Sequence, residues 1–173
     1  RASLPSELES IRELSKLRRH REALAAAEML ALKNPQNRHA LYLVAANQRC
    51  LNRIVEALTT LERLQQQHPK FSLLFQERGH CYMATGDARR AMNAFLEAVK
   101  LNPTLMQSWT MLERLHRETG DTEQAVAARQ QILMLHRLPP EVVRAGSLFS
   151  DGEFAIAEEI LNSYLNHGGL HAE

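Results

Sequence analysis

A spacing of 34 residues recurs along this chain of 173 residues. Self-similarity at an interval of this size is typical of helical repeat proteins, in which each repeat buries its hydrophobic face only against its neighbours. Such a chain folds by stacking supersecondary units rather than by building one central core. The positions that repeat at this interval are Pro35, Pro69 and Pro103; Ala23, Ala57, Ala91 and Ala125; Gly86 and Gly120; Phe75 and Trp109.

The composition favours helices over strands. Hydrophobic residues make up 45% of the chain, but aromatic residues only 5%, and Ala, Leu, Glu, Arg and Gln are good helix formers. In the segment "AMNAFLEAV", Ala91, Ala94, Phe95 and Ala98 recur at intervals of three and four, which places them on one helix face. We therefore predict an all-α protein.

The turns between helices have their own signals. Gly86 and Gly120 each precede an aspartate in the motif "TGD". A glycine there suits a left-handed helix end, and the aspartate can cap the next helix. Pro103 follows Asn102, and proline ends a helix because it lacks an N–H and disfavours helix in the preceding residue.

Residues 72–105 resemble the tetratricopeptide repeat. The resemblance implies a right-handed α-solenoid of about five helix hairpins, arranged as a single array over 1–173. The expected units are about 4–37, 38–71, 72–105, 106–139 and 140–167. The residues that match the family pattern in register are Phe75, Gly79, Tyr82, Gly86, Ala91, Phe95, Ala98 and Pro103.

Unit 106–139 departs from the family pattern. Glu113 stands at a position where the pattern has a small residue, because the two helices of a unit cross closely there. His116 and Arg129 replace an expected tyrosine and phenylalanine. An unpaired buried carboxylate is very costly, so we expect Glu113 either to tilt outward to water or to splay the helix pair.

The resemblance also implies a binding surface, the concave wall lined by the first helix of each unit. No acidic residue stands at its main positions, so one interpretation is a groove for a protein or peptide that carries acidic groups. An equally weighted alternative is a solvated helix face. The predicted contact residues are Arg12, His39, Tyr42, Arg49, Leu73, Gln76, His80, Met83, Gln107, Thr110, Arg114 and Arg117.

Charge alone is too weak to hold a partner on this wall. Exposed ion pairs contribute about 0 to 1 kcal/mol each, so four together give no better than about millimolar binding. Apolar anchors are therefore needed, and we expect them to be Tyr42, Leu73 and Met83, with Tyr42 the most important.

Other classes of function find little support in the sequence. The net charge of +1 gives no general attraction to nucleic acid, and we interpret "LRRHR" at 17–21 as a solvated turn. We expect no membrane span, no cofactor, no metal site and no catalytic constellation, because the usual motifs are missing. Gly168 and Gly169 lie between His167 and His171, which favours a frayed end over a metal site. Cys50 and Cys81 are predicted to be small buried thiols, and we favour a cytoplasmic location.

The last predicted helix has a broad apolar stripe. A terminal capping helix is normally polar on its outer face, so we expect the chain to be a fragment of a longer protein, or to form a homo-oligomer through this helix. The segment from Leu138 to Gly169 also resembles repeat arrays that precede a bacterial sulfotransferase domain. This second resemblance implies an alternative function, an accessory region that recruits substrate for, or dimerises, a larger enzyme. The stripe comprises Phe154, Ile156, Ala157, Ile160, Leu161, Tyr164 and Leu165.

Overall fold

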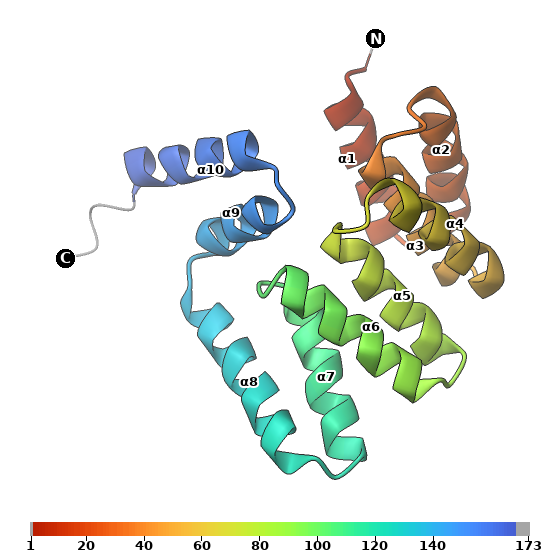
Figure 1. Ribbon diagram of the computed structural model, residues 1–173. Coiled ribbons are helices and arrows are strands. Elements are labelled where there is room, and N and C mark those ends of the chain that lie inside the picture. Colours follow the sequence, from red (N-terminus) through yellow and green to blue (C-terminus); the bar gives the residue numbers. More distant parts are fainter. Residues whose placement is uncertain (1, 169–173) are drawn as a thin grey trace. The chain divides into compact units, whose positions relative to one another are not determined.

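The computed structural model describes residues 2–168, and within this range every regular element is an α-helix. The predicted fold class, an all-α helical-repeat solenoid, is confirmed, and Figure 1 shows the helices following one another in hairpins. The helices are α1 (Leu4–Lys16), α2 (His20–Lys33), α3 (Arg38–Cys50), α4 (Ile54–Gln67), α5 (Ser72–Ala84), α6 (Ala88–Leu101), α7 (Met106–Glu118), α8 (Thr122–Arg137), α9 (Pro140–Ser150) and α10 (Phe154–His167).

The turns within the hairpins share one backbone conformation. Each contains a residue with positive φ, from Arg18 in the first turn to Gly152 in the last. Gly86 and Gly120 adopt φ values of 76° and 80°, as the "TGD" motif predicts. The aspartates that follow them accept hydrogen bonds from backbone N–H groups at the start of the next helix, at 3.0 and 3.2 Å. The predicted turn and cap are therefore confirmed.

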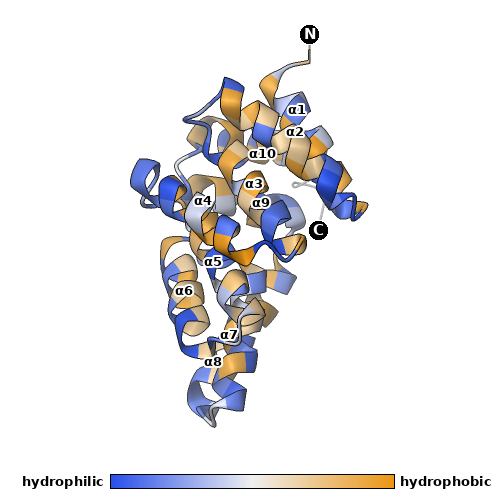
Figure 2. Cartoon of the chain, turned by 90° about the vertical axis from the view of Figure 1, so that its right-hand side faces the viewer, coloured by the Kyte–Doolittle hydropathy of each residue, from blue (hydrophilic) through white to orange (hydrophobic). Residues whose placement is uncertain are grey.

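The chain divides within α6, after Ala91, into two compact units. In the first unit, α3 packs against α1, α2, α4 and α5, so it is the central helix. Its apolar positions are buried against these neighbours, among them Ala40, Leu41 and Ala45, which have no exposed surface. Figure 2 shows that hydrophobic and hydrophilic residues alternate along the individual helices, which is the pattern this packing requires.

In the second unit, α7 pairs with α8 and α9 pairs with α10. A buried asparagine, Asn102, lies in the loop before α7 and donates a hydrogen bond to the Ser147 hydroxyl on α9 at 2.8 Å. Its side-chain oxygen, Oδ1, accepts a hydrogen bond from the Thr104 hydroxyl at 2.7 Å. A methyl group on Gly146 would lie 3.3 Å from Thr104 Cγ2, so α9 contacts this loop closely.

The prediction for Glu113 was wrong in both its forms. The residue neither tilts into water nor splays the helices, because it is only 8% exposed and α7 and α8 remain packed together. Its carboxylate is instead paired with two arginines, Arg117 at 2.5 Å and Arg129 at 3.2 Å. The two departures from the repeat pattern, Glu113 and Arg129, thus compensate each other.

Candidate functional site

The first unit carries most of the predicted contact residues. The helices α1, α3 and α5 are neighbours, since α3 packs against both of the others. Eight of the predicted contact residues lie on them. Gln76 is buried, and the other seven, which keep part of their surface accessible, are Arg12, His39, Tyr42, Arg49, Leu73, His80 and Met83.

Tyr42 belongs to an aromatic cluster built around Phe71. Phe71 is almost completely buried at the start of α5, and the Tyr42 ring meets it edge to face with 6.3 Å between centroids. The His39 ring does the same at 5.4 Å, and the Arg38 guanidinium lies 4.7 Å from the centre of the Phe71 ring. Phe71 therefore holds two wall residues in place. This role of Phe71 was not predicted from the sequence, although a phenylalanine directly before a helix was a visible signal.

A buried ion pair joins α3 and α5 on the same wall. Glu77 is only 2% exposed, and its carboxylate accepts a hydrogen bond from Arg49 Nε. Burial alone would lower the pKa of Arg49, but the charge of Glu77 and this hydrogen bond outweigh it, so the pKa is raised. Arg49 is thus already neutralised by a residue of its own chain.

The electrostatic surroundings of Tyr42 keep its hydroxyl protonated. Burial raises the pKa of the phenol, and the nearby charge of Glu77 raises it further, while Arg49 and Arg12 act in the opposite direction. Tyr42 therefore offers a neutral aromatic ring with one O–H group rather than a charge. This is the chemistry of an interface anchor, which combines an apolar body with a polar tip.

The two cysteines differ from each other. Cys81 is buried as predicted, and burial together with the charge of Glu77 raises its pKa to about 12. Cys50 is exposed, so the prediction of a buried thiol was wrong for this residue. It is the last residue of α3. Burial nevertheless raises the pKa of Cys50 as well, so neither thiol is activated as a nucleophile.

A polar network that sequence analysis missed fixes the first three helices relative to one another. Asn47 on α3 is 1% exposed, and its side-chain oxygen lies 3.1 Å from the Ser15 hydroxyl and 3.0 Å from His20 Nδ1. Its amide nitrogen donates to the Leu43 carbonyl at 2.9 Å. Buried polar groups that are satisfied in this way specify one packing arrangement. The network therefore positions the wall without lining it.

In the second unit, the predicted contact residues all lie on α7 and are exposed. Gln107 and Thr110 are at its start, and the Thr110 hydroxyl donates to the Met106 carbonyl at 2.9 Å. Arg114 is paired with Glu118 at 2.8 Å, and Arg117 is paired with the buried Glu113. Arg49, Arg114 and Arg117, which an acidic ligand would have to contact, therefore all have carboxylate partners within the chain.

Two cavities lie away from these residues. One, of about 620 Å³, is in the first unit and is lined by residues of α2, α3 and α4, such as Leu32, Val44 and Gln67. The other, of about 680 Å³, lies between α9 and α10 and is lined by Arg144, Ile160 and other residues. Neither contains any of the twelve predicted contact residues.

A metal-ligand cluster and a membrane-spanning helix are both absent from the part of the chain that the structure describes. In that part, no three His, Cys, Asp or Glu side chains are grouped so that they could hold a metal ion. His171, one of the two histidines considered in the sequence, lies outside it. No helix between residues 2 and 168 is long and apolar enough to cross a bilayer.

Comparison with known proteins supports the repeat family. The family model described as the tetratricopeptide repeat matches residues 74–105, the segment in which the sequence pattern is most regular. None of the curated proteins is significantly similar to the chain. The second resemblance, to arrays that precede a sulfotransferase domain, is not supported by the family match or by the similar solved structures.

Several solved structures share the fold. TTC0263, a thermophilic tetratricopeptide-repeat protein from Thermus thermophilus, has a TM-score of 0.68 at 22% identity, over 98% of this chain and 93% of that one. MamA from Desulfovibrio magneticus RS-1 has a TM-score of 0.61 at 18% identity, over 77% and 75% of the two chains. A chain of the Naa15/Naa10 complex bound to HypK-THB has a TM-score of 0.66 at 20% identity, over 92% of this chain and 25% of that one. At these identities the likeness concerns the fold alone.

Proposed function

We propose that this chain is a protein–protein interaction module that binds a peptide or partner protein on the wall formed by α1, α3 and α5. The wall of α1, α3 and α5 carries the proposal, because its anchors Tyr42, Leu73 and Met83 keep part of their surface accessible after the helices have packed. Partly exposed aromatic and apolar side chains on a rigid support are what dominate binding energy at protein interfaces.

The ion pairs change which kind of ligand this wall favours. An acidic ligand would have to compete with Glu77 for Arg49 and with Glu118 for Arg114, and exposed pairs contribute little in any case. We therefore place the apolar anchors first and the arginines second in the recognition of a partner. None of the contacts described favours an accessory role in a larger enzyme.

Peptides selected from a random phage-displayed library against the intact chain would test this proposal. We expect Met83→Ala and Tyr42→Ala each to weaken binding of the selected peptides by roughly tenfold or more, as for interface anchors. Arg114→Glu should change affinity by less than about threefold, since the arginine is already paired. Leu32→Ala, on the exposed surface of α2, is the matched control.

Because Tyr42 packs on Phe71, Tyr42→Ala also needs a folding check, and circular dichroism at the binding temperature provides it. Met83 lies near the end of α5 and Phe71 lies just before its start, so Met83→Ala serves as the independent variant. The proposal would be wrong if the selected peptides bound both variants as tightly as the unchanged chain, or if Leu32→Ala weakened them equally.

A further inference from the structure

The cavity of about 620 Å³ in the first unit has an apolar floor and polar ends. It is lined by Ala31 and Leu32 of α2, by Val44 and Gln48 of α3 and by Gln67 of α4, among others, and we call it the α2–α4 cavity. Because α3 packs against both α2 and α4, it supplies the floor. Ala31 and Val44 are buried there, while Leu32 at the rim is 81% exposed.

The equivalent place in the following repeat is filled. At the interval of 34 residues, Ala31 corresponds to Gln65 and Val44 to Arg78. The Arg78 guanidinium donates a hydrogen bond to Gln65 Oε1 at 2.8 Å, so two long polar side chains stand where α2 and α3 have a methyl and an isopropyl group. The cavity that Gln65 and Arg78 line is smaller, about 430 Å³. Two small residues, which the repeat does not require, therefore give the α2–α4 cavity its apolar floor.

Two glutamines at the ends of this floor carry unused hydrogen-bonding groups. Gln48 is only 6% exposed, and its Oε1 accepts a hydrogen bond from the Thr60 hydroxyl at 2.8 Å. Its amide nitrogen makes no hydrogen bond to any residue between 2 and 168. Gln67 Oε1 is covered and likewise has no partner in that range. A buried amide without partners costs free energy, so a ligand that supplies them is favoured.

The separation of the two glutamines fits a short stretch of extended chain. Gln48 lies beside Thr60, and Gln67 follows Thr60 by seven residues on α4, which is about 10 Å along the helix. About three residues of an extended peptide span this length. Because side chains alternate in such a peptide, its middle residue can point to Val44 and Ala31 while its backbone amides lie near the two ends.

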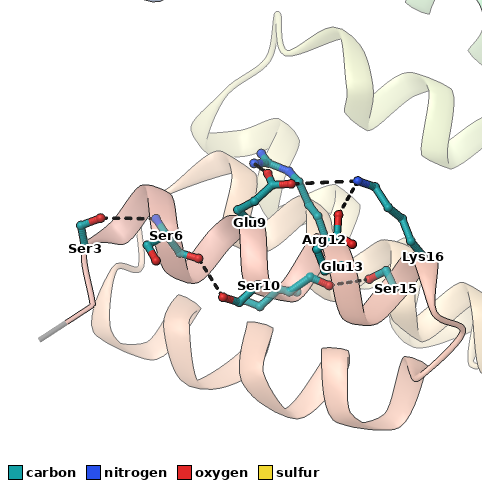
Figure 3. Close-up of polar contacts among 9 residues, drawn as sticks. Ser3, Ser6, Glu9, Ser10, Arg12, Glu13, Ser15 and Lys16 are labelled. Atoms are coloured by element: carbon teal, nitrogen blue, oxygen red, sulfur yellow. Dashed lines mark hydrogen bonds and ion pairs between the residues drawn. The ribbon is translucent and has the colours of Figure 1, made fainter.

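The charged residues that line the cavity do not select for an ion. On α1, opposite charges pair with each other, as Figure 3 shows for Lys16 and Glu13 at 2.6 Å. Glu28 on α2 and Arg63 on α4 line the α2–α4 cavity, and neither has an ion-pair partner among the described residues. A carboxylate and a guanidinium on two different helices give no net preference for an anion or a cation. A neutral amide is therefore the ligand chemistry that fits.

We propose that the α2–α4 cavity binds an extended segment of a partner protein, with one aliphatic side chain on Val44 and Ala31. A peptide carbonyl accepts a hydrogen bond from the Gln48 amide. A peptide N–H donates to Gln67, whose terminal amide can rotate because the last torsion of a glutamine is broad. The site goes beyond the proposed function, since none of the wall residues lines it. One buried leucine and two neutral hydrogen bonds correspond to about millimolar binding.

A short capped peptide would test this site on the intact chain. We expect acetyl-Ala-Leu-Ala-amide to shift the side-chain amide NMR signals of Gln48 and Gln67, with a Kd of about 1 mM. Acetyl-Ala-Gly-Ala-amide lacks the leucine side chain and should bind at least about tenfold more weakly. No shift of these two signals up to about 20 mM peptide, or equal binding of the two peptides, would overturn the proposal.

Variants of the chain separate this site from the wall. Ala31→Gln with Val44→Arg copies the pair that fills the equivalent place, so it should raise the Kd of the leucine peptide above about 20 mM. Gln67→Leu should weaken binding at least about threefold, whereas Gln66→Leu, at the neighbouring exposed position, and Met83→Ala on the wall should leave it unchanged. Binding that survives both cavity variants, or that Met83→Ala removes, would contradict the proposal. Circular dichroism checks folding, and Gln67→Leu decides the test if the double variant does not fold.

Discussion

The α3–α4 and α7–α8 hairpins occupy equivalent positions in the 34-residue pattern, but different chemistry joins their helices. In the first, Ala45 and Leu61 are fully buried and the contact is apolar. In the second, Glu113 and Arg129 take the equivalent places and form an ion pair, to which Arg117 adds a second cation. Both hairpins keep their helices packed.

The comparison shows that the repeat geometry requires complementary partners rather than one set of residues. A small residue opposite a large apolar one fills the space, and so does a carboxylate opposite a long arginine side chain. The two solutions differ in energy. Glu113 loses hydration where it is buried beside its two largely exposed arginines, so the pairs add little net stability, but removing a partner leaves the buried carboxylate less well compensated. The α7–α8 hairpin should therefore be the more sensitive to loss of a charge.

The largest effect is expected from placing a carboxylate in the α3–α4 hairpin, at the position equivalent to Glu113, without a partner arginine. Ala45→Glu places an unpaired charge at a position with no exposed surface, so it should lower the free energy of unfolding by more than about 4 kcal/mol. Urea denaturation followed by circular dichroism would measure this. Ala25→Glu, on the exposed face of α2, should change stability by less than about 0.5 kcal/mol. If Ala45→Glu were as harmless as this control, the requirement for complementary partners would not hold.

A rescue experiment sharpens the same prediction. Adding Leu61→Arg to Ala45→Glu copies the pair found in α7–α8, and we expect it to recover part of the lost stability. Leu61→Arg alone should be destabilising, because it buries a cation without a partner. If the stability losses of Ala45→Glu and Leu61→Arg simply added in the double variant, the glutamate–arginine pair would be able to replace the apolar pair only in the α7–α8 hairpin.

An intermediate effect is expected from removing one partner of Glu113. Arg129→Met keeps much of the side-chain length but leaves the carboxylate with Arg117 alone, so it should lower the free energy of unfolding by about 1–3 kcal/mol. The single tryptophan, Trp109, lies on α7 and reports unfolding of this hairpin by fluorescence. Arg137→Met at the end of α8 is the control.

The double variant Glu113→Leu/Arg129→Leu separates specificity from stability. Replacing both charges with apolar residues restores the chemistry of α3–α4, and it should be neutral or stabilising. A loss larger than that of Arg129→Met would mean that the ion pair itself supplies net stability to this hairpin.

The smallest effect concerns the turns of two hairpins. Arg18 in the α1–α2 turn has a φ of 59°, where the α7–α8 turn has Gly120 at 80°. Residues other than glycine are strained at positive φ, so Arg18→Gly should raise the free energy of unfolding by about 1 kcal/mol. Gly120→Ala should lower it by a similar amount. Thermal unfolding would measure both, and a destabilised Arg18→Gly would count against a strained turn.

The sequence predicted the helices and their turns well because these depend on local interactions. The interval between prolines and alanines marked the hairpins, and the "TGD" motifs marked left-handed turns that the structure contains. The candidate site was less accessible to prediction. Arg49, Arg114 and Arg117 looked like free cations along the sequence. The partner of Arg49, Glu77, comes from another helix. The pairing of Arg114 with Glu118 and of Arg117 with Glu113 lies within α7 and was not predicted. Phe71 and Asn47, which hold the wall in place, were missed for the same reason.

The amino-acid sequence by itself determined that this chain forms helical hairpins at a 34-residue interval, because helix propensity, turn residues and apolar spacing act over a few residues. Only the tertiary structure decided which charges are neutralised and which apolar side chains stay accessible. These properties depend on distances between helices, which pair Arg49, Arg114 and Arg117 of the predicted wall with carboxylates of the same chain and leave Phe154, Leu161 and Leu165 on α10 exposed.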